Sequence, residues 1–386
     1  MHDMRILLAF VLVFLAVEAG AVTVTLRVTV PETTPLDATV FVTGNFQDWD
    51  PGDPDFALTP VDDRVHAIDL EFQPGTRIEF RFTRGSWGTA ERDPAGGEIT
   101  SRRITVDEGR VHELAVPRWA DTEIVRTLTG DVTEHTVDDL LDGRRVWVYL
   151  PPGYRESDRT YPVLYMLDGQ NVFDVSTSFA GEWRVDETCE EQIAAGAMQP
   201  IVVVALDNGG ARRVFEYTPS TDARRGIGGG ADAHFTAIVD TLMPWVERSY
   251  RVRTGPAATG FAGSSLGGLM ALVAALEHDD HFGRIGAISP SLWWDEGVIL
   301  DRFEQAPKPD VRLWADMGTE EGSDVQGSGA YVRDLRELRA TLLDEGFVEG
   351  EDLIVHVDEG GRHHEEAWAR RFGDVLRFLF PPDDGR

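Results

Sequence analysis

The sequence is poor in two residue types, cysteine and lysine. Cys189 is the single cysteine among 386 residues, so no disulfide can form within one chain. Lys308 is the single lysine, and the balance of 36 basic against 67 acidic side chains gives a formal net charge of -31. This balance argues against nucleic acid as a partner. A strongly acidic surface instead favours solubility in high salt, where screening reduces the self-repulsion of the folded chain.

The sequence also lacks apolar runs long enough to span a membrane, and the N-terminus has only a short one. Arg5 precedes the apolar run 6–17, which is too short to span a bilayer, so we expect no membrane span. The run is followed by the small residues 19–21, and this order is typical of a secretory signal peptide cut before Val22. We therefore expect residues 1–21 to be a signal peptide of a secreted or periplasmic protein, with an uncleaved or lipid-associated N-terminus as the alternative.

Signatures of metal and phosphate sites are absent as well. The glycine-rich segment 226–230 is not followed by the Lys-Ser/Thr pair of a phosphate-binding loop. The run His363-His364-Glu365 lacks the i, i+4 spacing of zinc ligands on a helix. The sequence therefore predicts no metal and no other cofactor.

The apolar content is sufficient for two domains, since hydrophobic residues make up 42% of the chain. Residues 22–117 show apolar and polar residues in alternation, for example at 65–72 and 77–82, with Gly, Pro and Asp turns between the runs. This pattern predicts an all-β, immunoglobulin-like sandwich of about seven short strands. A short linker at 117–121 then leads into a second domain, which we place at 118–386.

The second domain alternates between strand-like and helix-like segments, which predicts an α/β fold with a mostly parallel, doubly wound sheet. Apolar runs typical of buried strands lie at 145–150, 162–167, 201–206, 257–263, 285–289, 311–317 and 353–357. Amphipathic helices are expected at 182–195, 233–249, 266–276, 331–345 and 364–379.

The most informative motif is Gly263-Ser264-Ser265-Leu266-Gly267, which lies where a strand-like run gives way to a helix-like one. At such a junction the pattern Gly-x-Ser-x-Gly is typical of a nucleophile elbow, a sharp turn that exposes the hydroxyl of the central serine, here Ser265. A chance match is expected in roughly one chain in eight of this composition, so the motif needs support from other residues.

Support comes from residues later in the chain, because hydrolases with this elbow carry an acid and then a histidine after the serine. His363 lies on a glycine-rich loop before the last predicted helix and is the candidate base for Ser265. The acidic loop 318–324 offers three carboxylates to orient this histidine: Glu320, Glu321 and Asp324. The implied chemistry is acyl transfer through a serine ester.

With further motifs around them, these residues make the segment 122–380 resemble the putative esterase family of α/β-hydrolases, which includes enterochelin esterases, esterase D, feruloyl esterases and mycolyl transferases. The shared motifs are Leu167-Asp168-Gly169-Gln170, Gly181-Glu182-Trp183, Arg213 with Glu216-Tyr217-Thr218-Pro219, the elbow with Gly268, Ser289-Pro290-Ser291-Leu292-Trp293-Trp294, Gly318-Thr319, and His363 with Trp368. The resemblance implies Ser265 as nucleophile, His363 as base and Glu321 as acid. It also implies an oxyanion hole made by the N–H groups of Leu266 and Gln170.

The same motifs contain five candidate substrate contacts: Trp183, Arg213, Tyr217, Trp293 and Trp294. An ion pair between Arg213 and Glu216 is an equally good expectation for that arginine. Trp293 and Trp294 are adjacent and point to different sides, which predicts one pocket wall and one core residue.

Residues 22–117 resemble the starch-binding and glycogen-recognition class of carbohydrate modules, at the segments 44–51 and 80–87. The resemblance implies that Trp49 stacks on a sugar. The second indole of that class lies just before an Asp-Pro pair, whereas Asp93-Pro94 has no adjacent tryptophan and Trp87 lies six residues upstream of Asp93. Trp49 and Trp87 are therefore candidate glycan contacts, and the alternative is that they cover the sandwich core or dock the second domain.

Together these features predict a secreted serine carboxylesterase that works through a Ser-His-Glu triad and an acyl-enzyme. The expected substrate is an acylated carbohydrate, including an acylated polysaccharide, or a siderophore-type ester. Two alternatives are an acyltransferase that uses a sugar alcohol as acceptor and a non-catalytic glycan-binding protein.

Overall fold

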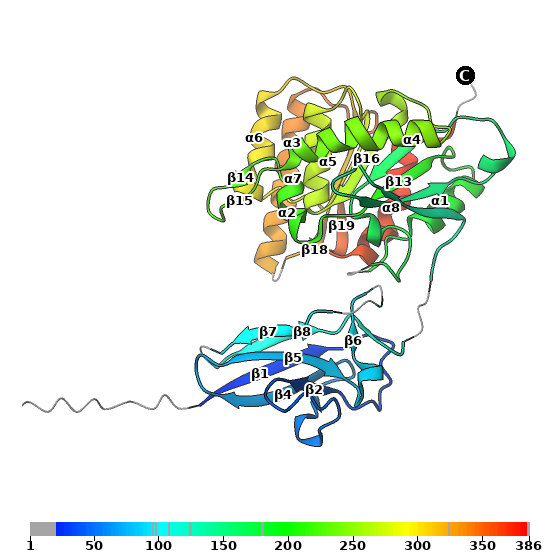
Figure 1. Ribbon diagram of the computed structural model, residues 1–386. Coiled ribbons are helices and arrows are strands. Elements are labelled where there is room, and N and C mark those ends of the chain that lie inside the picture. Colours follow the sequence, from blue (N-terminus) through cyan, green and yellow to red (C-terminus); the bar gives the residue numbers. More distant parts are fainter. Residues whose placement is uncertain are drawn as a thin grey trace, which may run out of the picture. The chain divides into compact units, whose positions relative to one another are not determined.

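The computed structural model divides the chain into two compact units, Met1–Ile124 and Val125–Arg386 (Figure 1). It describes residues 21–383 except 95, 97–98, 107–108, 123–125, 179–180 and 323–324. Nearly all of the predicted signal peptide lies outside the described residues, and so does Asp324. Of the helices that are described, none is both long and apolar enough to cross a bilayer.

The first unit consists of short strands in two main sheets that share one core. The sheets have the strand orders β3-β4-β1-β8 and β2-β5-β7. Alternate residues of the two sheets, including Val24, Leu26, Phe80 and Phe82, are fully buried in the shared core, as the period of two requires. This arrangement is the predicted β-sandwich. Its strands are β1 (Val22–Thr29), β2 (Phe41–Gly44), β3 (Thr59–Pro60), β4 (Val65–Phe72), β5 (Arg77–Thr83), β6 (Glu91–Arg92), β7 (Arg102–Thr105), β8 (Val111–Ala115) and β9 (Arg118–Trp119).

The sandwich extends beyond the boundary that we predicted between residues 117 and 118. Strand β9 pairs with β6, and the Trp119 indole is fully buried in the sandwich core. Its Nε1–H donates a hydrogen bond to Thr34 Oγ1 at 2.8 Å, which satisfies the polar end of the buried ring. The predicted linker was wrong because a two-residue strand next to a proline has no recognisable periodicity.

The second unit contains an eight-stranded sheet of order β10-β11-β13-β12-β16-β17-β18-β19. The pairs from β13 to β19 are parallel, and β10 and β11 add two antiparallel pairs at one edge. The strand β10 was missed in the sequence because most of its residues are polar and partly exposed. The strands are β10 (Asp131–Val137), β11 (Arg144–Leu150), β12 (Val163–Met166), β13 (Val202–Leu206), β16 (Thr259–Ser264), β17 (Arg284–Ile288), β18 (Arg312–Glu320) and β19 (Leu353–Arg362), besides the short hairpin β14 (Thr221–Asp222) and β15 (Ile227–Gly228).

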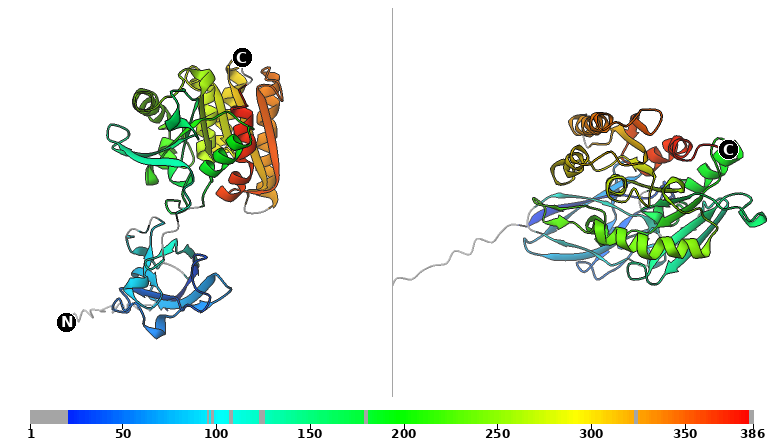
Figure 2. Two further views of the ribbon diagram at one scale, coloured as in Figure 1. Left: turned by 90° about the vertical axis from the view of Figure 1, so that its right-hand side faces the viewer. Right: turned by 90° about the horizontal axis from the view of Figure 1, so that it is seen from above.

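Helices cover both faces of this sheet (Figures 1 and 2). Helices α3 to α7 contribute to the core on one face, and α1 and α8 contribute to the core on the other. Residues of the central strands alternate between the two cores, so these strands are buried on both sides, as expected of a parallel sheet. The helices are α1 (Val185–Ala194), α2 (Arg213–Glu216), α3 (Ala231–Ala237), α4 (Met243–Ser249), α5 (Leu266–Glu277), α6 (Val298–Gln305), α7 (Val325–Asp344) and α8 (Glu365–Leu379). The short α2 and α6 were not predicted.

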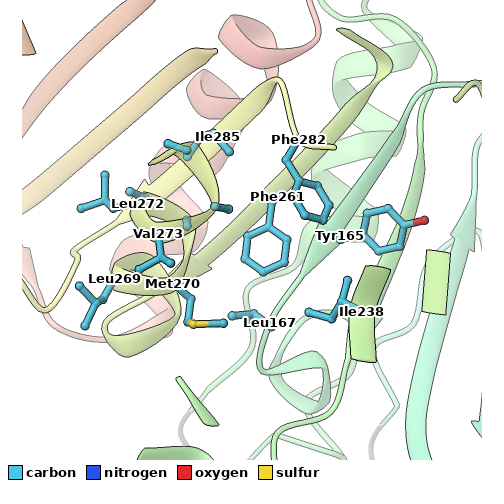
Figure 3. Packing of buried hydrophobic residues seen from close by; sticks show 14 of the residues in the cluster. Tyr165, Leu167, Ile238, Phe261, Leu269, Met270, Leu272, Val273, Phe282 and Ile285 are labelled. Atoms are coloured by element: carbon cyan, nitrogen blue, oxygen red, sulfur yellow. The ribbon is translucent and has the colours of Figure 1, made fainter. Parts of the chain in front are cut away.

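The centre of the larger core fixes the two elements that flank Ser265. Phe261 of β16 packs against Phe282 with ring centroids 5.0 Å apart, and Figure 3 shows both rings beside residues of α5. Residues 266–275 of α5 are all buried. The strand before the serine and the helix after it are therefore both held by the core.

Candidate functional site

Ser265 lies at the turn between β16 and α5 in a backbone conformation that is rare for a residue with a side chain. Its φ is 58° and its ψ is -120°. Such a conformation costs about 1–3 kcal/mol and persists only where the surrounding structure imposes it. Here the Ser265 N–H donates to Ile288 O at 3.1 Å, and the Ser265 carbonyl accepts from the N–H groups of Ser291 and Leu269 at 3.0 Å each. The turn has the geometry of the predicted elbow.

Glu321 and His363 meet across the ends of β18 and β19. Glu321 Oε2 lies 2.9 Å from His363 Nδ1, and the Glu321 side chain is 1% exposed. A buried carboxylate on Nδ1 holds the imidazole so that Nε2 is free to accept a proton. The Trp368 ring packs edge-on against the imidazole at 5.1 Å between centroids, which further limits its rotation.

The other two carboxylates of the acidic loop are not in this position. The Glu320 side chain is 61% exposed and lies 3.9 Å from Arg362. Asp324 lies outside the described residues. Of the two glutamates, the structure brings Glu321 to His363.

Ser289, which the sequence did not mark as functional, fixes the orientation of the Glu321 carboxylate. Its Oγ accepts hydrogen bonds from Trp368 Nε1 at 2.9 Å and from Arg371 Nη2 at 2.8 Å. Both lone pairs of the hydroxyl are then occupied, so its single hydrogen points to Glu321 Oε1, with which it makes a short hydrogen bond. The Gly318 N–H donates to the same oxygen at 2.6 Å, and Oε2 is left for the histidine.

Arg371 connects this arrangement to the interior of the sheet. The guanidinium is 5% exposed and pairs with the fully buried Asp316 at 2.8 Å and with Asp358 at 3.0 Å. Burial opposes the charge of Arg371, but the facing carboxylates of Asp316, Glu321 and Asp358 outweigh burial and raise its pKa. Asp316 also accepts from the Ser289 N–H at 3.1 Å. Ser289 directly follows β17 and belongs to a shared motif, but Asp316, Asp358 and Arg371 lie on β18, β19 and α8 and belong to none, so sequence patterns do not reveal the network.

Ser265 and His363 line the same small cavity of about 130 Å³. Among the described residues the hydrogen bond of Ser265 Oγ is with Ser291 Oγ at 3.4 Å, and no direct bond joins it to His363. Catalytic hydrogen bonds are often long in substrate-free enzymes and shorten when substrate binds. A wider hollow of about 540 Å³ adjoins the cavity and shares Glu321 and His363 with it.

The loop that carries Gln170 is held by Asp168, whose φ of 55° marks a left-handed turn. Arg213 clamps the Asp168 carboxylate through two contacts of 2.7 Å, and Asn208 adds a third of 2.7 Å. A Cβ at Gly169 would lie 2.6 Å from the Ala205 backbone, so the turn passes too close to β13 for any other residue. Arg213 thus pairs with Asp168, and the expected partner Glu216 instead binds Arg144.

Three of the five expected substrate contacts lie in the core. Trp183 packs between Trp368 and Phe372 at centroid distances of 5.5 and 5.2 Å. Tyr217 is fully buried, with its hydroxyl oxygen accepting from the Asp168 N–H at 3.3 Å, and buried Trp294 donates to Ser220 O at 3.2 Å. The aromatic type of these residues suggested a pocket, but their rings are used to support loops around it.

Trp293 is the expected contact that does line the small cavity. It is 37% exposed, and the Arg225 guanidinium lies 4.8 Å from its ring. Met317 and Tyr331, which the sequence did not mark, line the same cavity. Trp294 is 2% exposed and does not line this cavity, so the adjacent tryptophans divide into one wall and one core residue, as predicted.

Glu365 is a further buried carboxyl near the site. It is the first residue of α8, and Asn171 Nδ2 donates to its Oε1 at 3.0 Å. Burial raises the pKa of Glu365 to about 7, and the nearby Asp168 carboxylate acts in the same direction. The contact joins the loop of Gln170 to the helix that follows His363.

Trp49 and Trp87, the candidate glycan contacts, lie together on the sandwich. Their ring centroids are 6.5 Å apart with an angle of 34° between the planes, and Trp87 is 44% exposed. Trp49 is half-buried in a left-handed turn with φ of 57°. Trp87 does not lie directly before the Asp-Pro pair, as the second indole of the carbohydrate modules does. It nevertheless forms an aromatic pair with Trp49.

Comparison with known proteins decides the family. The family model described as "Putative esterase" matches residues 140–379, more than half of the chain. The chain belongs to this family. It is a carboxylic ester hydrolase, as the predicted resemblance implied.

Of two individual relatives, one is named an esterase and the other an alpha-amylase. The chain is 26% identical over 308 residues to the iron(III) enterobactin esterase of Dickeya dadantii (strain 3937). The aligned segment covers 76% of this chain and 64% of that protein. It is 40% identical over 105 residues to an alpha-amylase of Niallia circulans, covering 27% of this chain and 8% of the amylase. The chain therefore spans under two thirds of either relative.

Solved structures agree on the fold. The enterobactin esterase FES of Shigella flexneri, in the presence of enterobactin, matches 92% of each chain with a TM-score of 0.53 at 19% identity. At this identity the likeness concerns the fold alone. The predicted α/β-hydrolase fold is confirmed.

The two glycines of the elbow motif should respond differently to substitution. A Cβ at Gly263 would lie 2.8 Å from the Gly267 backbone, whereas a Cβ at Gly267 meets its nearest atom at 3.5 Å, an ordinary contact. Gly263→Ala should therefore lower the free energy of unfolding by about 1–3 kcal/mol through overpacking. Gly267→Ala, in the first turn of α5, should leave it unchanged or raise it slightly. Urea unfolding of the three proteins measures the difference, and equal values for both variants would contradict the close approach.

Proposed function

We propose that Ser265, His363 and Glu321 form the catalytic triad of a serine carboxylesterase. The observation that carries this proposal is the 2.9 Å contact between the buried Glu321 carboxylate and His363 Nδ1, beside a cavity that Ser265 also lines. A carboxylate, an imidazole and a hydroxyl in this order are the parts that acyl transfer through a serine ester needs.

In the proposed reaction, substrate binding turns the Ser265 hydroxyl from Ser291 toward His363. His363 Nε2 takes the serine proton as Oγ attacks the ester carbonyl, and Glu321 stabilises the imidazolium that forms. The imidazolium then gives its proton to the departing alkoxide, which leaves an acyl-enzyme. Water, deprotonated by the same histidine, releases the acid and restores Ser265.

The N–H groups of Leu266 and Gln170 are proposed to bind the oxyanion. Leu266 is the first residue of α5, and the first N–H groups of a helix have no acceptor within it. The macrodipole of α5 adds positive potential at that point. Each such donor is worth about 3 kcal/mol in the transition state. The clamp on Asp168 by Arg213 supports the loop that presents Gln170.

We propose a siderophore-type ester as the substrate. The relative of Dickeya dadantii is named an iron(III) enterobactin esterase, and 76% of this chain aligns with it. The small cavity of about 130 Å³ accommodates an ester group rather than a whole siderophore. The adjoining hollow of about 540 Å³ offers room for the bulk of such a molecule.

An acylated carbohydrate is the second candidate, and the Trp49–Trp87 pair favours it. Two aromatic rings on one surface are suited to stacking against sugar rings, and the alpha-amylase relative acts on a glucan by its name. In this case the sandwich would bring an acylated polysaccharide to the esterase unit.

We further propose that residues 1–21 direct export to the periplasm or the medium. The order of charged, apolar and small residues supports this proposal.

The net charge of -31 is best explained as adaptation to high salt. Activity should then be higher in high salt than in dilute buffer, because screening reduces self-repulsion.

The triad is tested by p-nitrophenyl acetate hydrolysis in low and high salt. Ser265→Ala and His363→Ala should each lower kcat by at least about 10³-fold, and Glu321→Gln by about 10²–10⁴-fold, because the imidazole loses its orienting charge. Glu320→Gln is the matched control, with the same change one residue away, and should keep activity within about twofold of the parent. Full activity in Ser265→Ala, or equal losses in both glutamate variants, would contradict the assignment.

The substrate proposal is tested by competing esters. The parent should hydrolyse a 2,3-dihydroxybenzoyl-serine lactone with kcat/KM at least about tenfold above that for acetylated xylan or feruloylated arabinoxylan. Trp49→Ala and Trp87→Ala should leave the siderophore rate unchanged. The acylated carbohydrate replaces the siderophore-type ester as the proposed substrate if two results are found together. The parent would prefer the acylated glycans, and both tryptophan variants would lose binding to acetylated xylan in its insoluble form.

A further inference from the structure

Three carboxylates outside the triad come together at the start of α1. Glu182, Asp186 and Glu187 each place one oxygen within 4.8 Å of the others. Glu182 and Glu187 border a hollow of about 630 Å³ that residues of α1 and α8 line and that does not include Ser265. The proposed reaction uses none of the three.

The cluster contains buried oxygens without partners. Asp186 is 0% exposed, and its Oδ2 accepts from the Thr129 N–H at 2.6 Å while its Oδ1 has no hydrogen-bond partner. Glu182 Oε1 and Glu187 Oε2 are also buried and unpartnered. A buried acceptor without a donor costs about 1–3 kcal/mol, and more when the group is charged. Three such oxygens at one place indicate that a further group satisfies them.

Neighbouring arginines do not supply this group. Arg184 Nε donates to Glu187 Oε1 at 3.4 Å, but its side chain is largely exposed and the other oxygen of Glu187 stays unpartnered. Arg126 lies 3.8 Å from Asp174, a different carboxylate. Neither arginine therefore satisfies the unpartnered oxygens of the cluster.

We propose that Glu182, Asp186 and Glu187 bind one calcium ion. The donor set consists of oxygen alone, which hard cations prefer to the nitrogen and sulfur sites of zinc. Two oxygens bound to one calcium ion lie at most about 5 Å apart, so three oxygens within 4.8 Å of one another are close enough to share that ion. Calcium takes six to eight oxygens, and water from the adjoining hollow can provide the remainder.

The ion would join three segments of the esterase unit. Asp186 is tied to Thr129, just before β10, while Glu182 lies on the loop that leads into α1. That loop is in turn bonded to the turn of Gln170, since the Trp183 N–H donates to Asn171 O at 2.8 Å and the Val185 N–H donates to Val172 O at 3.1 Å. We therefore expect calcium to stabilise the loop behind the proposed oxyanion hole.

The test is equilibrium dialysis of the full chain with ⁴⁵Ca²⁺ in about 0.5 M NaCl, which screens weak binding to the acidic surface. The parent should bind one ion per chain, and Asp186→Asn should bind none, because the amide removes the buried charge yet keeps an acceptor for Thr129. Glu187→Gln gives an independent loss if Asp186→Asn does not fold. Glu191→Gln is the matched control: this exposed residue of α1 lines the same hollow outside the cluster and should bind as the parent does.

Thermal unfolding provides the second readout, and neither readout depends on the proposed esterase activity. About 5 mM CaCl₂ should raise the Tm of the parent and of Glu191→Gln by about 3 °C, with no change in the two cluster variants. An equal concentration of MgCl₂ should have a smaller effect. Absence of binding by the parent, or equal binding by the parent and both cluster variants, would overturn the proposal and assign protons to the cluster instead.

Discussion

The site depends on the way in which one hydroxyl group, that of Ser289, is forced to donate. Trp368 and Arg371 both donate to its oxygen, so its hydrogen can only go to Glu321. Glu321 is thereby held with one oxygen inward and the other toward His363. The buried Arg371–Asp316 pair fixes the guanidinium beside Ser289, and removing either member of such a pair costs about 3–5 kcal/mol because the other charge is left buried and unpaired.

The same logic of rigid support applies to Ser265. Its strained backbone persists because β16 and α5 are anchored in the larger core on either side of the turn, around Phe261 and the buried face of α5. Gly263 permits the close approach that the turn needs. In the proposed mechanism the Ser265 backbone therefore needs no rearrangement when an ester binds and only its hydroxyl turns, and preorganisation of this kind is a large part of what an enzyme contributes to the rate.

Much of this site was accessible from sequence, and the reasons are local. Ser265 belongs to a contiguous motif, His363 and Glu321 follow it in a fixed order, and the central strands have strong apolar periodicity. The Arg371–Asp316–Ser289 network was not predictable: Ser289 lies in a shared motif that gives no sign of its partners, and Asp316 and Arg371 are far apart in the chain and belong to no motif. Trp183, Tyr217 and Trp294 were misplaced for the opposite reason: a motif shared with a family marks them as important without telling whether they support a loop or contact substrate.

The central claim is that Ser265 is a nucleophile activated by His363 and Glu321, and covalent trapping tests it most directly. The full chain is treated with a fluorophosphonate, and the labelled peptide is identified by mass spectrometry. The account predicts one phosphonyl adduct on Ser265, with labelling slowed at least about 10²-fold in His363→Ala and in Glu321→Gln but unchanged in Glu320→Gln. An adduct on Ser264 or Ser291, or equally fast labelling in all variants, would contradict it.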